Sequence, residues 1–293
     1  MAIGDQYFFP APAKLNLFLH VLGQLENGYH ALQSVFQLIA LQDRIGLEVD
    51  FSSSEIHLEE PQELACGTDN LAYRAARMLQ EATGCTNGAR IQLHKNIPVG
   101  AGLGGGSSDA ATVLVGLNEL WQLKCSEQEL LRLGGRLGSD VPFFIHGKNA
   151  WVTGTGDELT DMEVPETWFL VVYPGVQVST GQIFQHSDLT RGTPARTIAR
   201  FSEDGGNTDS WSNDLESVVF RLFPEVQSAK NWLSQWGTVK MSGSGSSVFL
   251  DVGSEENGQA VLLQIPKKWT GYLIPSLNSS SLHTQLQRYQ SET

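Results

Sequence analysis

The glycine-rich segment at residues 98–108, with the sequence Pro-Val-Gly-Ala-Gly-Leu-Gly-Gly-Gly-Ser-Ser, constrains this chain more than any other. Glycine costs about 1 kcal/mol in the interior of a helix or strand. This number of glycines in a short stretch therefore needs a physical reason. An apolar stripe with helical spacing follows, formed by Ala110, Val113, Leu114, Leu117 and Trp121. The segment therefore predicts a tight turn that leads into a helix over residues 107–121.

A turn of this kind is suited to bind an anion. The first backbone N–H groups of a helix have no partner within the helix, and the helix dipole adds partial positive charge there. Glycines let the backbone approach phosphate oxygens closely. The hydroxyls of Ser107 and Ser108 lie where the helix begins, where they can cap it or reach a magnesium ion on the phosphates. We predict a phosphate-binding loop.

Two generic phosphate motifs fit this segment poorly. Residues 100–105 formally satisfy G-x-G-x-x-G, but a dinucleotide fold needs a buried strand running straight into the glycines and an acid about 20 residues later. Here the preceding strand is half polar, Pro98 interrupts the entry, and Glu119 falls inside the next helix. The G-x-x-x-x-G-K-[ST] motif fails because no lysine follows the glycines. A tight connection without ligand is the alternative that remains.

The length and the net charge of the chain limit the classes of protein to which it can belong. A chain of 293 residues favours two domains, and the net charge of −13 argues against a nucleic-acid or anionic-membrane partner. No apolar run approaches the ~20 residues of a membrane helix, and the first residues do not resemble a signal peptide. The three cysteines form no disulfide framework or zinc-type pair. We expect a cytoplasmic protein.

The order of predicted elements indicates a mixed α+β fold, with a domain join near residue 160. Alternating apolar residues over 15–21 predict a strand with one buried face, and the same period puts Lys14 and Asn16 on the opposite face. A polar stretch at 202–213 predicts a solvent-exposed loop. Further strands are predicted at 34–41, 44–49, 90–94, 150–152 and 168–173, and helices at 71–83 and from 126 to an end near 134–138.

Two charged residues far apart in the sequence suit phosphoryl transfer. Lys14 lies near a strand start, and a buried lysine is costly unless it is paired. Asp140 follows a helix and precedes an apolar stretch. Each alone is as readily structural, as a solvent-facing lysine or a capping aspartate. Together they could supply charge stabilisation and a group that takes a hydroxyl proton.

Several separate segments resemble the galactokinase–homoserine kinase–mevalonate kinase–phosphomevalonate kinase (GHMP) superfamily. Its phosphate loop is similar to residues 98–111. Within the superfamily, the chain resembles the kinases that act on 4-diphosphocytidyl-2-C-methyl-D-erythritol. The segments that carry this narrower resemblance are Pro12–Leu17, Asn27–His30, Gly104–Gly106, Gly138–Phe143, Asn213–Glu216 and Ser242–Gly245.

The resemblance implies a fold and a reaction. The fold would be a two-domain α+β GHMP-kinase fold, with an N-terminal ribosomal-protein-S5-like domain at 1–160, a C-terminal ferredoxin-like α/β sandwich at 161–293 and the active cleft between them. The reaction would be ATP-dependent phosphorylation of the substrate's 2-hydroxyl in the non-mevalonate isoprenoid pathway. The protein would be a monomer or a weak homodimer without a tightly bound cofactor.

The resemblance also implies roles for individual residues. Asp140 would be the catalytic aspartate and Lys14 its charged partner. The ATP phosphates, with Mg²⁺, would bind at 98–108, with Ser108 as a magnesium contact. The remaining expected contacts are Asn70, Leu71 and Lys95 at the nucleotide, Asn16 and Thr180 at the substrate, Tyr29 and Phe184 stacking on the cytosine, and His30 bonding to its edge.

Two positions differ from the family pattern. Asp109 stands where an uncharged residue can occur, and Ser242–Gly245 reads Ser-Gly-Ser-Gly where relatives often carry threonines. A homoserine-type or mevalonate-type kinase, or a nucleotide-binding regulator without activity, are the alternatives. The aromatic residues Tyr29 and Phe184 speak against a small aliphatic alcohol as the substrate.

Overall fold

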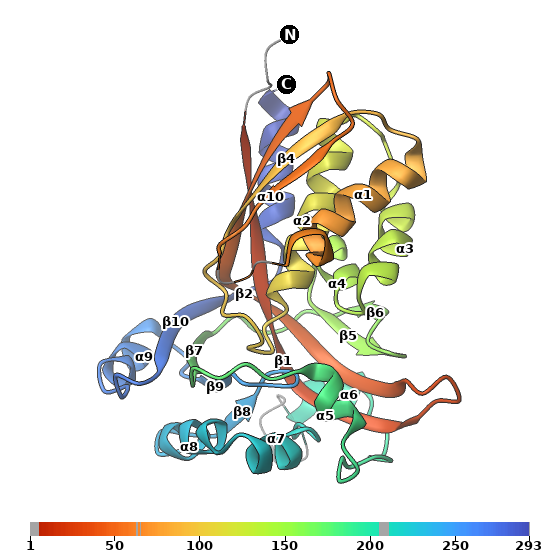
Figure 1. The fold of residues 1–293 in the computed structure, drawn as a ribbon. Helices are drawn as coiled ribbons and strands as arrows, with labels where there is room; N and C mark the ends of the chain where they lie inside the picture. The colour runs from red at the N-terminus through yellow and green to blue at the C-terminus, as the bar shows by residue number, and fades with distance from the viewer. Residues whose placement is uncertain (1–5, 63, 65, 205–210, 293) are drawn as a thin grey trace.

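Two long antiparallel strands, β1 (Tyr7–Gln24) and β2 (His30–Asp50), run through the whole molecule (Figure 1). The computed structural model describes residues 6–62, 64, 66–204 and 211–292. The two strands predicted at 34–41 and 44–49 are therefore one. The register of the hairpin shifts between Pro12 and Ala13, so β2 stays continuous through an irregularity instead of breaking.

The prediction that β1 has only one buried face is wrong. Lys14 and Asn16 are 3% and 1% exposed, although they lie on the face opposite Leu15. The cause is the position of β1, which is covered on both sides by other parts of the chain. Its residues contribute to four separate apolar clusters, through Phe9, Leu15, Phe18 and Val21.

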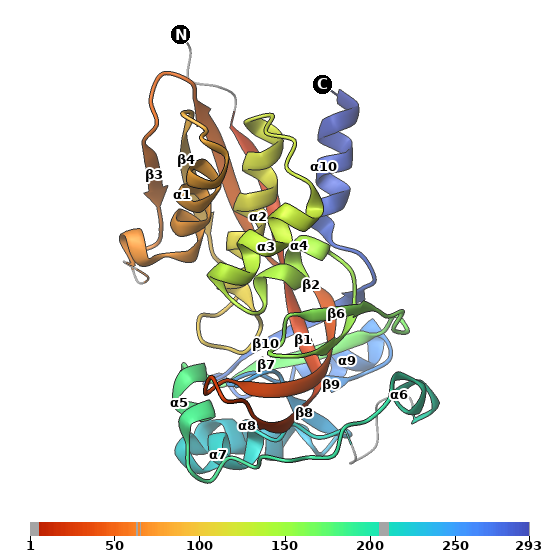
Figure 2. The same cartoon turned by 90° about the vertical axis from the view of Figure 1, so that its right-hand side faces the viewer.

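The upper part of the molecule is a sheet covered by helices on one face (Figure 2). Strand β2 pairs with β4 antiparallel, and β4 pairs with β3 in parallel. The elements of this part are β3 (Ile56–Glu59), α1 (Leu71–Thr83), β4 (Gly88–His94), α2 (Gly105–Leu120), α3 (Glu127–Leu137), α4 (Val141–His146), β5 (Ala150–Thr153) and β6 (Glu158–Asp161). The bounds of α1 match the prediction, because Asn70 caps its start and Gly84 ends it in a left-handed conformation.

The lower part continues the same sheet in the order β2-β10-β7-β9-β8. Only two residue pairs join β10 to β2, at Ile39 and Leu38, so this junction is narrow. The elements here are β7 (Trp168–Tyr173), α5 (Thr180–Gln185), α6 (Ile198–Asp204), α7 (Glu216–Leu222), α8 (Pro224–Leu233), β8 (Val239–Met241), β9 (Val248–Asp251), α9 (Glu255–Leu262) and β10 (Thr270–Leu277).

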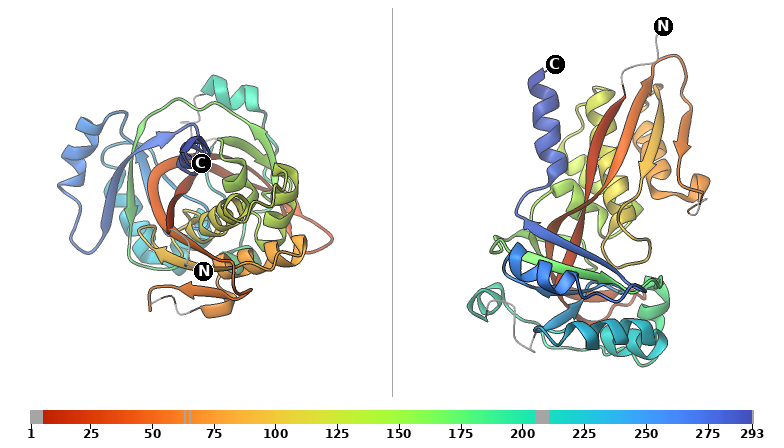
Figure 3. Two further views of the ribbon diagram at one scale, coloured as in Figure 1. Left: turned by 90° about the horizontal axis from the view of Figure 1, so that it is seen from above. Right: turned by 90° about the vertical axis from the view of Figure 1, so that its left-hand side faces the viewer.

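The last helix returns to the upper part. Helix α10 (Ser281–Glu292) runs beside β1 and β2, as the right-hand view of Figure 3 shows. Leu282 and Leu286 join the upper apolar cluster, and the rings of Tyr7 and Tyr289 lie 4.9 Å apart at their centroids. The two ends of the chain are thus packed against each other.

The prediction of a solvent-exposed loop at 202–213 is wrong at both ends of this stretch. Residues 202–204 finish helix α6, and Trp211 is completely buried against the ring of Phe18. Residues 205–210 lie outside the described residues. The three cysteines are unpaired, as expected. Among the described residues no helix has the length and apolarity to cross a membrane.

Two loops interlock where the upper and lower parts meet. The Ser242 hydroxyl donates to the Gly102 carbonyl at 2.8 Å, and the Ser247 amide donates to the Ala101 carbonyl at 3.0 Å. Gly102 has a φ of +74°, and a Cβ there would lie 2.1 Å from the Ser242 carbonyl oxygen. Glycine is required here for its conformation and for the close approach of the two backbones.

We expect Gly102→Ala to destabilise the protein by about 2 kcal/mol or more, because a side chain would strain the backbone and separate the two loops. Urea unfolding measures this loss. Gly106→Ala is the matched control, because Gly106 has ordinary helical backbone and its nearest neighbour to a Cβ is a Leu71 methyl at 3.8 Å. Equal stability of the two variants would contradict the proposed interlock.

Candidate active site

A cavity of about 450 Å³ lies where the glycine-rich loop, β1 and the lower part meet. It gathers most of the residues predicted from the sequence, which come from distant segments. The predicted residues that line it are Lys14, Asn16, Asn70, Leu71, Lys95, Pro98, Val99, Gly100, Ala101, Gly102, Leu103, Gly104, Gly105, Gly106, Ser107, Asp140, Thr180 and Phe184. Ser108, Tyr29 and His30 are not among the lining residues.

The glycine-rich loop forms one wall of this cavity and ends in helix α2. Gly104 precedes the helix with a φ of +75°, and a Cβ there would lie 2.7 Å from the ring of Phe144. The first amides of α2 have no partner within the helix, and the residues that carry them line the cavity. This wall can therefore bind an anion such as a phosphate group.

The two serines at the helix start differ in position. Ser107 lines the cavity, whereas the Ser108 hydroxyl is fully buried and has no hydrogen-bond partner among the described residues. A magnesium contact through Ser108 would need its side chain to turn toward the cavity. Of the two serines, Ser107 is the one that already lines the cavity.

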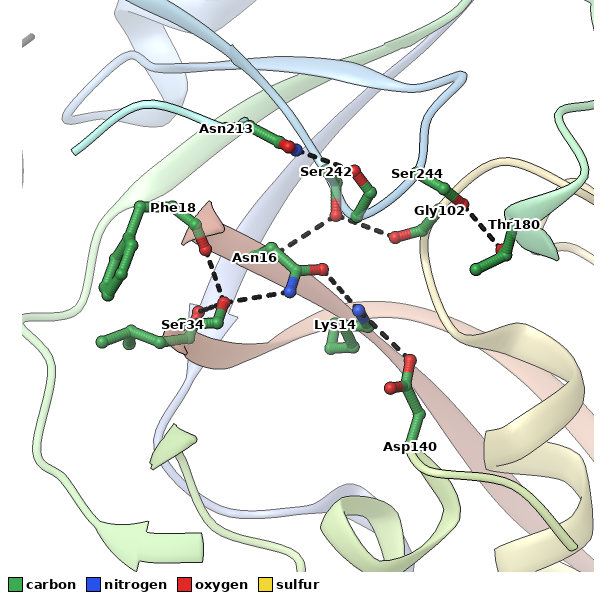
Figure 4. A network of polar contacts seen from close by, with 12 residues as sticks. Lys14, Asn16, Phe18, Ser34, Gly102, Asp140, Thr180, Asn213, Ser242 and Ser244 are labelled. Atoms are coloured by element: carbon green, nitrogen blue, oxygen red, sulfur yellow. Dashed lines mark hydrogen bonds and ion pairs between the residues drawn. The ribbon is translucent and has the colours of Figure 1, made fainter. Parts of the chain in front are cut away.

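Lys14 is a buried charge that lines the cavity and is paired with Asn16 and Asp140 (Figure 4). It lies 3.3 Å from a carboxylate oxygen of Asp140 and donates a hydrogen bond to the Asn16 side-chain oxygen. Its ammonium also lies 4.3 Å from the centre of the Phe36 ring. Its backbone amide donates to the Leu103 carbonyl at 3.0 Å, which joins the strand to the phosphate loop.

Asp140 lies at the start of α4, opposite Lys14 and across from the glycine-rich loop. Its carboxylate makes no capping hydrogen bond to the helix, so it remains available to the cavity. It is 27% exposed at the side chain, whereas Lys14 is 4% exposed. A hydroxyl placed between Asp140 and the loop would meet both a proton acceptor and a nearby positive charge.

A hydrogen-bond network holds this pair in place. The Asn16 amide group donates to the Ser34 hydroxyl at 3.0 Å, and the Ser242 hydroxyl accepts the Asn16 backbone N–H at 3.2 Å. Thr180 and Ser244 pair through their hydroxyls at 2.7 Å, close to the same point (Figure 4). Ser242, which bonds to Asn16 on β1 and to Gly102 in the glycine-rich loop, thus connects the two parts of the molecule. The sequence signalled 242–245 as a Gly/Ser loop, but nothing in it singled out Ser34.

Lys95 lies in the cavity wall but is held by two carboxylates. It forms ion pairs with Asp43 and Asp109, and Asp43 also accepts the backbone N–H groups of Asn96 and Ile97 at 2.6 and 2.8 Å. Burial disfavours the Lys95 charge, but the carboxylates of Asp109 and Asp43 outweigh it and raise the Lys95 pKa. Sequence analysis missed Asp43, which fixes the entry to the loop.

This cluster contains two carboxylates, Asp43 and Asp109, around one lysine, Lys95. Burial raises the pKa of Asp109 to about 7, the negative charge of Asp43 adds to the rise, and Lys95 opposes it. One oxygen of Asp109 has no hydrogen-bond partner among the described residues. Asp109 lines the cavity, and its other carboxylate oxygen pairs with the Lys95 ammonium.

Of the residues predicted to contact the cytosine, only Phe184 lines the cavity, while His30 and Tyr29 lie outside its lining. Phe184 lines it from α5, and the His30 ring lies 5.3 Å from the Phe184 ring between centroids. Tyr29 is 66% exposed on the turn between β1 and β2. His30, in contrast, is 7% exposed at the start of β2, and Phe184 is partly buried on α5.

Replacing Asp109 with asparagine should change how stability depends on pH. Because the folded state holds the Asp109 proton more tightly than the unfolded chain does, the contribution of Asp109 to wild-type stability falls as pH rises from about 4 to about 7. Asp109→Asn lacks this loss, so its free energy of unfolding relative to wild type should rise across that window and level off above it. Urea unfolding at several pH values measures the difference.

Asp161→Asn is the control for this experiment. Hydrogen bonds from Lys148 and His146 hold the pKa of Asp161 below its usual value, so its replacement should give no gain in stability as pH rises. Parallel pH profiles for wild type and Asp109→Asn would show that Asp109 ionises without hindrance.

Comparison with known proteins places the chain in a family of kinases. Residues 70–148 match the family model described as GHMP kinases N terminal domain, and residues 199–271 match GHMP kinases C terminal. A mevalonate kinase from L. major has the same fold, with a TM-score of 0.66 and 14% identity over 94% of this chain and 97% of that one.

Closer relatives share one name. A 4-diphosphocytidyl-2-C-methyl-D-erythritol kinase of Mannheimia succiniciproducens is 41% identical over 97% of this chain and 92% of its own length, and that of Alcanivorax borkumensis is 44% identical over 94% and 92%. A crystal structure of 4-(cytidine 5'-diphospho)-2C-methyl-D-erythritol kinase aligns with a TM-score of 0.78 and 35% identity, over 92% of this chain and 99% of that one. The chain belongs to the 4-diphosphocytidyl-2-C-methyl-D-erythritol kinase family of GHMP kinases.

Proposed function

We propose that this protein transfers the γ-phosphoryl group of ATP to the 2-hydroxyl of 4-diphosphocytidyl-2-C-methyl-D-erythritol. The observation that carries the proposal is the Lys14–Asp140 pair, which faces the glycine-rich loop inside one cavity. A loop that binds phosphate and a carboxylate that accepts a proton are the two parts that this reaction needs. Relatives of this chain at 40% identity and above carry the name of this activity.

Different residues would bind the phosphates, accept the proton and stabilise the developing charge. The loop amides and the start of α2 would bind the ATP phosphates, and ATP would enter together with Mg²⁺ as one substrate complex. Asp140 would accept the proton of the attacking hydroxyl. Lys14 would stabilise the negative charge that develops, while Asn16 holds the Lys14 ammonium in position.

The acceptor substrate would bind along the rest of the cavity. Thr180 lies beside the loop at Ser242–Gly245, and Phe184 lies further along the same wall. We propose that Phe184 and the exposed Tyr29 stack on the cytosine and that His30 bonds to its edge. Asn70 and Leu71 would contact the nucleotide. The cytoplasmic location and the monomeric or weakly dimeric state stay predictions.

Two alternatives are less well supported. A homoserine kinase and two mevalonate kinases that share the fold are 14–17% identical to this chain. A regulator without activity would not need both a buried lysine and its carboxylate partner in the cavity, because a buried charge is costly to keep. Both alternatives predict no phosphorylation of the cytidyl substrate.

The proposed activity can be tested directly. Purified protein with ATP, Mg²⁺ and 4-diphosphocytidyl-2-C-methyl-D-erythritol should release ADP and give a product heavier by one phosphoryl group in mass spectrometry. Homoserine and mevalonate should not be turned over, and cytidine diphosphate should compete with the substrate. Turnover of homoserine or mevalonate in preference to the cytidyl compound would overturn the proposal.

Asp140→Asn should lower kcat by roughly a hundredfold or more, because asparagine cannot accept the hydroxyl proton. ATP binding, measured by calorimetry, should remain, since the loop is untouched. Asp161→Asn, a change on β6 outside the cavity, is the control and should keep full activity. Full activity of Asp140→Asn would remove this residue from the mechanism.

A further inference from the structure

Arg191 contacts both His30, at the start of β2, and the chain around Phe184, which lines the cavity. Its Nε donates a hydrogen bond to His30 Nε2 at 2.9 Å. The terminal nitrogens donate to backbone carbonyls of Phe184, His186 and Leu189 at 3.0, 3.1 and 3.3 Å. A single guanidinium therefore holds the histidine on β2 and the chain around Phe184 on α5.

The segment that carries Arg191 is itself anchored to the hairpin. The backbone N–H groups of Gly192 and Thr193 both donate to the Val21 carbonyl, at 2.9 and 3.1 Å. Arg191 thus approaches His30 from a fixed direction. Helix α5 lies beside the turn between β1 and β2 (Figure 2), which brings Phe184 within 5.3 Å of the His30 ring.

The hydrogen bond from Arg191 determines which nitrogen of His30 carries the proton. A guanidinium is always protonated and can only donate, so His30 Nε2 must accept. The neutral imidazole then carries its hydrogen on Nδ1. Burial and the positive charge of Arg191 both lower the His30 pKa, which keeps the ring neutral.

We propose that Arg191 is a positioning residue that fixes His30 as an Nδ1–H donor and thereby makes the site selective for cytosine. The proposal rests on the proposed function, in which His30 bonds to the edge of the base. Cytosine presents acceptors at N3 and O2. Uracil carries a hydrogen on N3, so the same edge would set a donor against the fixed N–H of His30 and leave both unpaired.

The first test observes the tautomer in the wild-type protein. Nitrogen-15 NMR of labelled histidine side chains separates the two neutral tautomers and the imidazolium, and His30→Gln identifies the His30 signals. We expect His30 to be neutral at pH 7 with its hydrogen on Nδ1. A hydrogen on Nε2, or an imidazolium, would overturn the inference without the need for any variant of Arg191.

The second test measures selectivity, with cytidine diphosphate and uridine diphosphate as the probes in calorimetry. Wild type should bind the cytidine compound at least about tenfold more tightly. In Arg191→Met, cytidine diphosphate affinity and this preference should both fall, and the substrate KM should rise about tenfold. The KM for ATP should not change. Arg191→Lys, which keeps the charge but cannot make all four contacts, should lie between.

Arg221→Met is the matched control. Arg221 contacts Asp188 and His186 on the outer side of the same segment without reaching His30. It should leave the tautomer and the base preference as in wild type. An unchanged preference in Arg191→Met or Arg191→Lys would overturn the inference. Absence of wild-type turnover would instead refute the proposed function, so the two failures are distinguishable.

Discussion

The buried charge of Lys14 is the constraint on which the active site depends. A lysine ammonium with 4% exposure must be paired, because an unpaired buried charge is very costly. Its partners come from the strand itself, from Asp140 at the start of α4, and from the ring of Phe36 on β2. The same pairing that makes the charge tolerable also places the carboxylate opposite the phosphate loop, so the stability of the site and its chemistry have one origin.

The hairpin of β1 and β2, which carries Lys14, joins the upper and lower parts of the molecule. Both strands cross from the upper to the lower part, and β1 is buried on both faces along most of its length. The interlock of Gly102 with Ser242 closes the same junction from the other side. The phosphate loop is held at its entry by Asp43 and at its end by the close packing of Gly104 on Phe144. A loop with five glycines is thereby fixed in position.

Different kinds of interaction dominate at the two ends of the cavity. At the loop end, charged groups and backbone amides line the cavity, where we propose that they act on a phosphoryl group, and a small displacement would weaken that interaction. Toward the other end lies the ring of Phe184, with His30 next to it, and Arg191 holds both. Selectivity at that end depends on the direction of one N–H bond, which a guanidinium sets more reliably than solvent does.

The sequence by itself determined the local features. Glycine density predicted the turn and the start of α2, capping residues predicted the first turns of α1 and α3, and the motifs around Lys14 and Asp140 indicated two charged residues that the structure places 3.3 Å apart. Only the tertiary structure decided that β1 is buried on both faces, that Lys95 is paired with Asp43 and Asp109, and that Arg191 reaches His30. The reason is physical: capping and turn preferences act within a few residues, whereas burial and ion pairing depend on residues brought together from 52 and 161 positions apart.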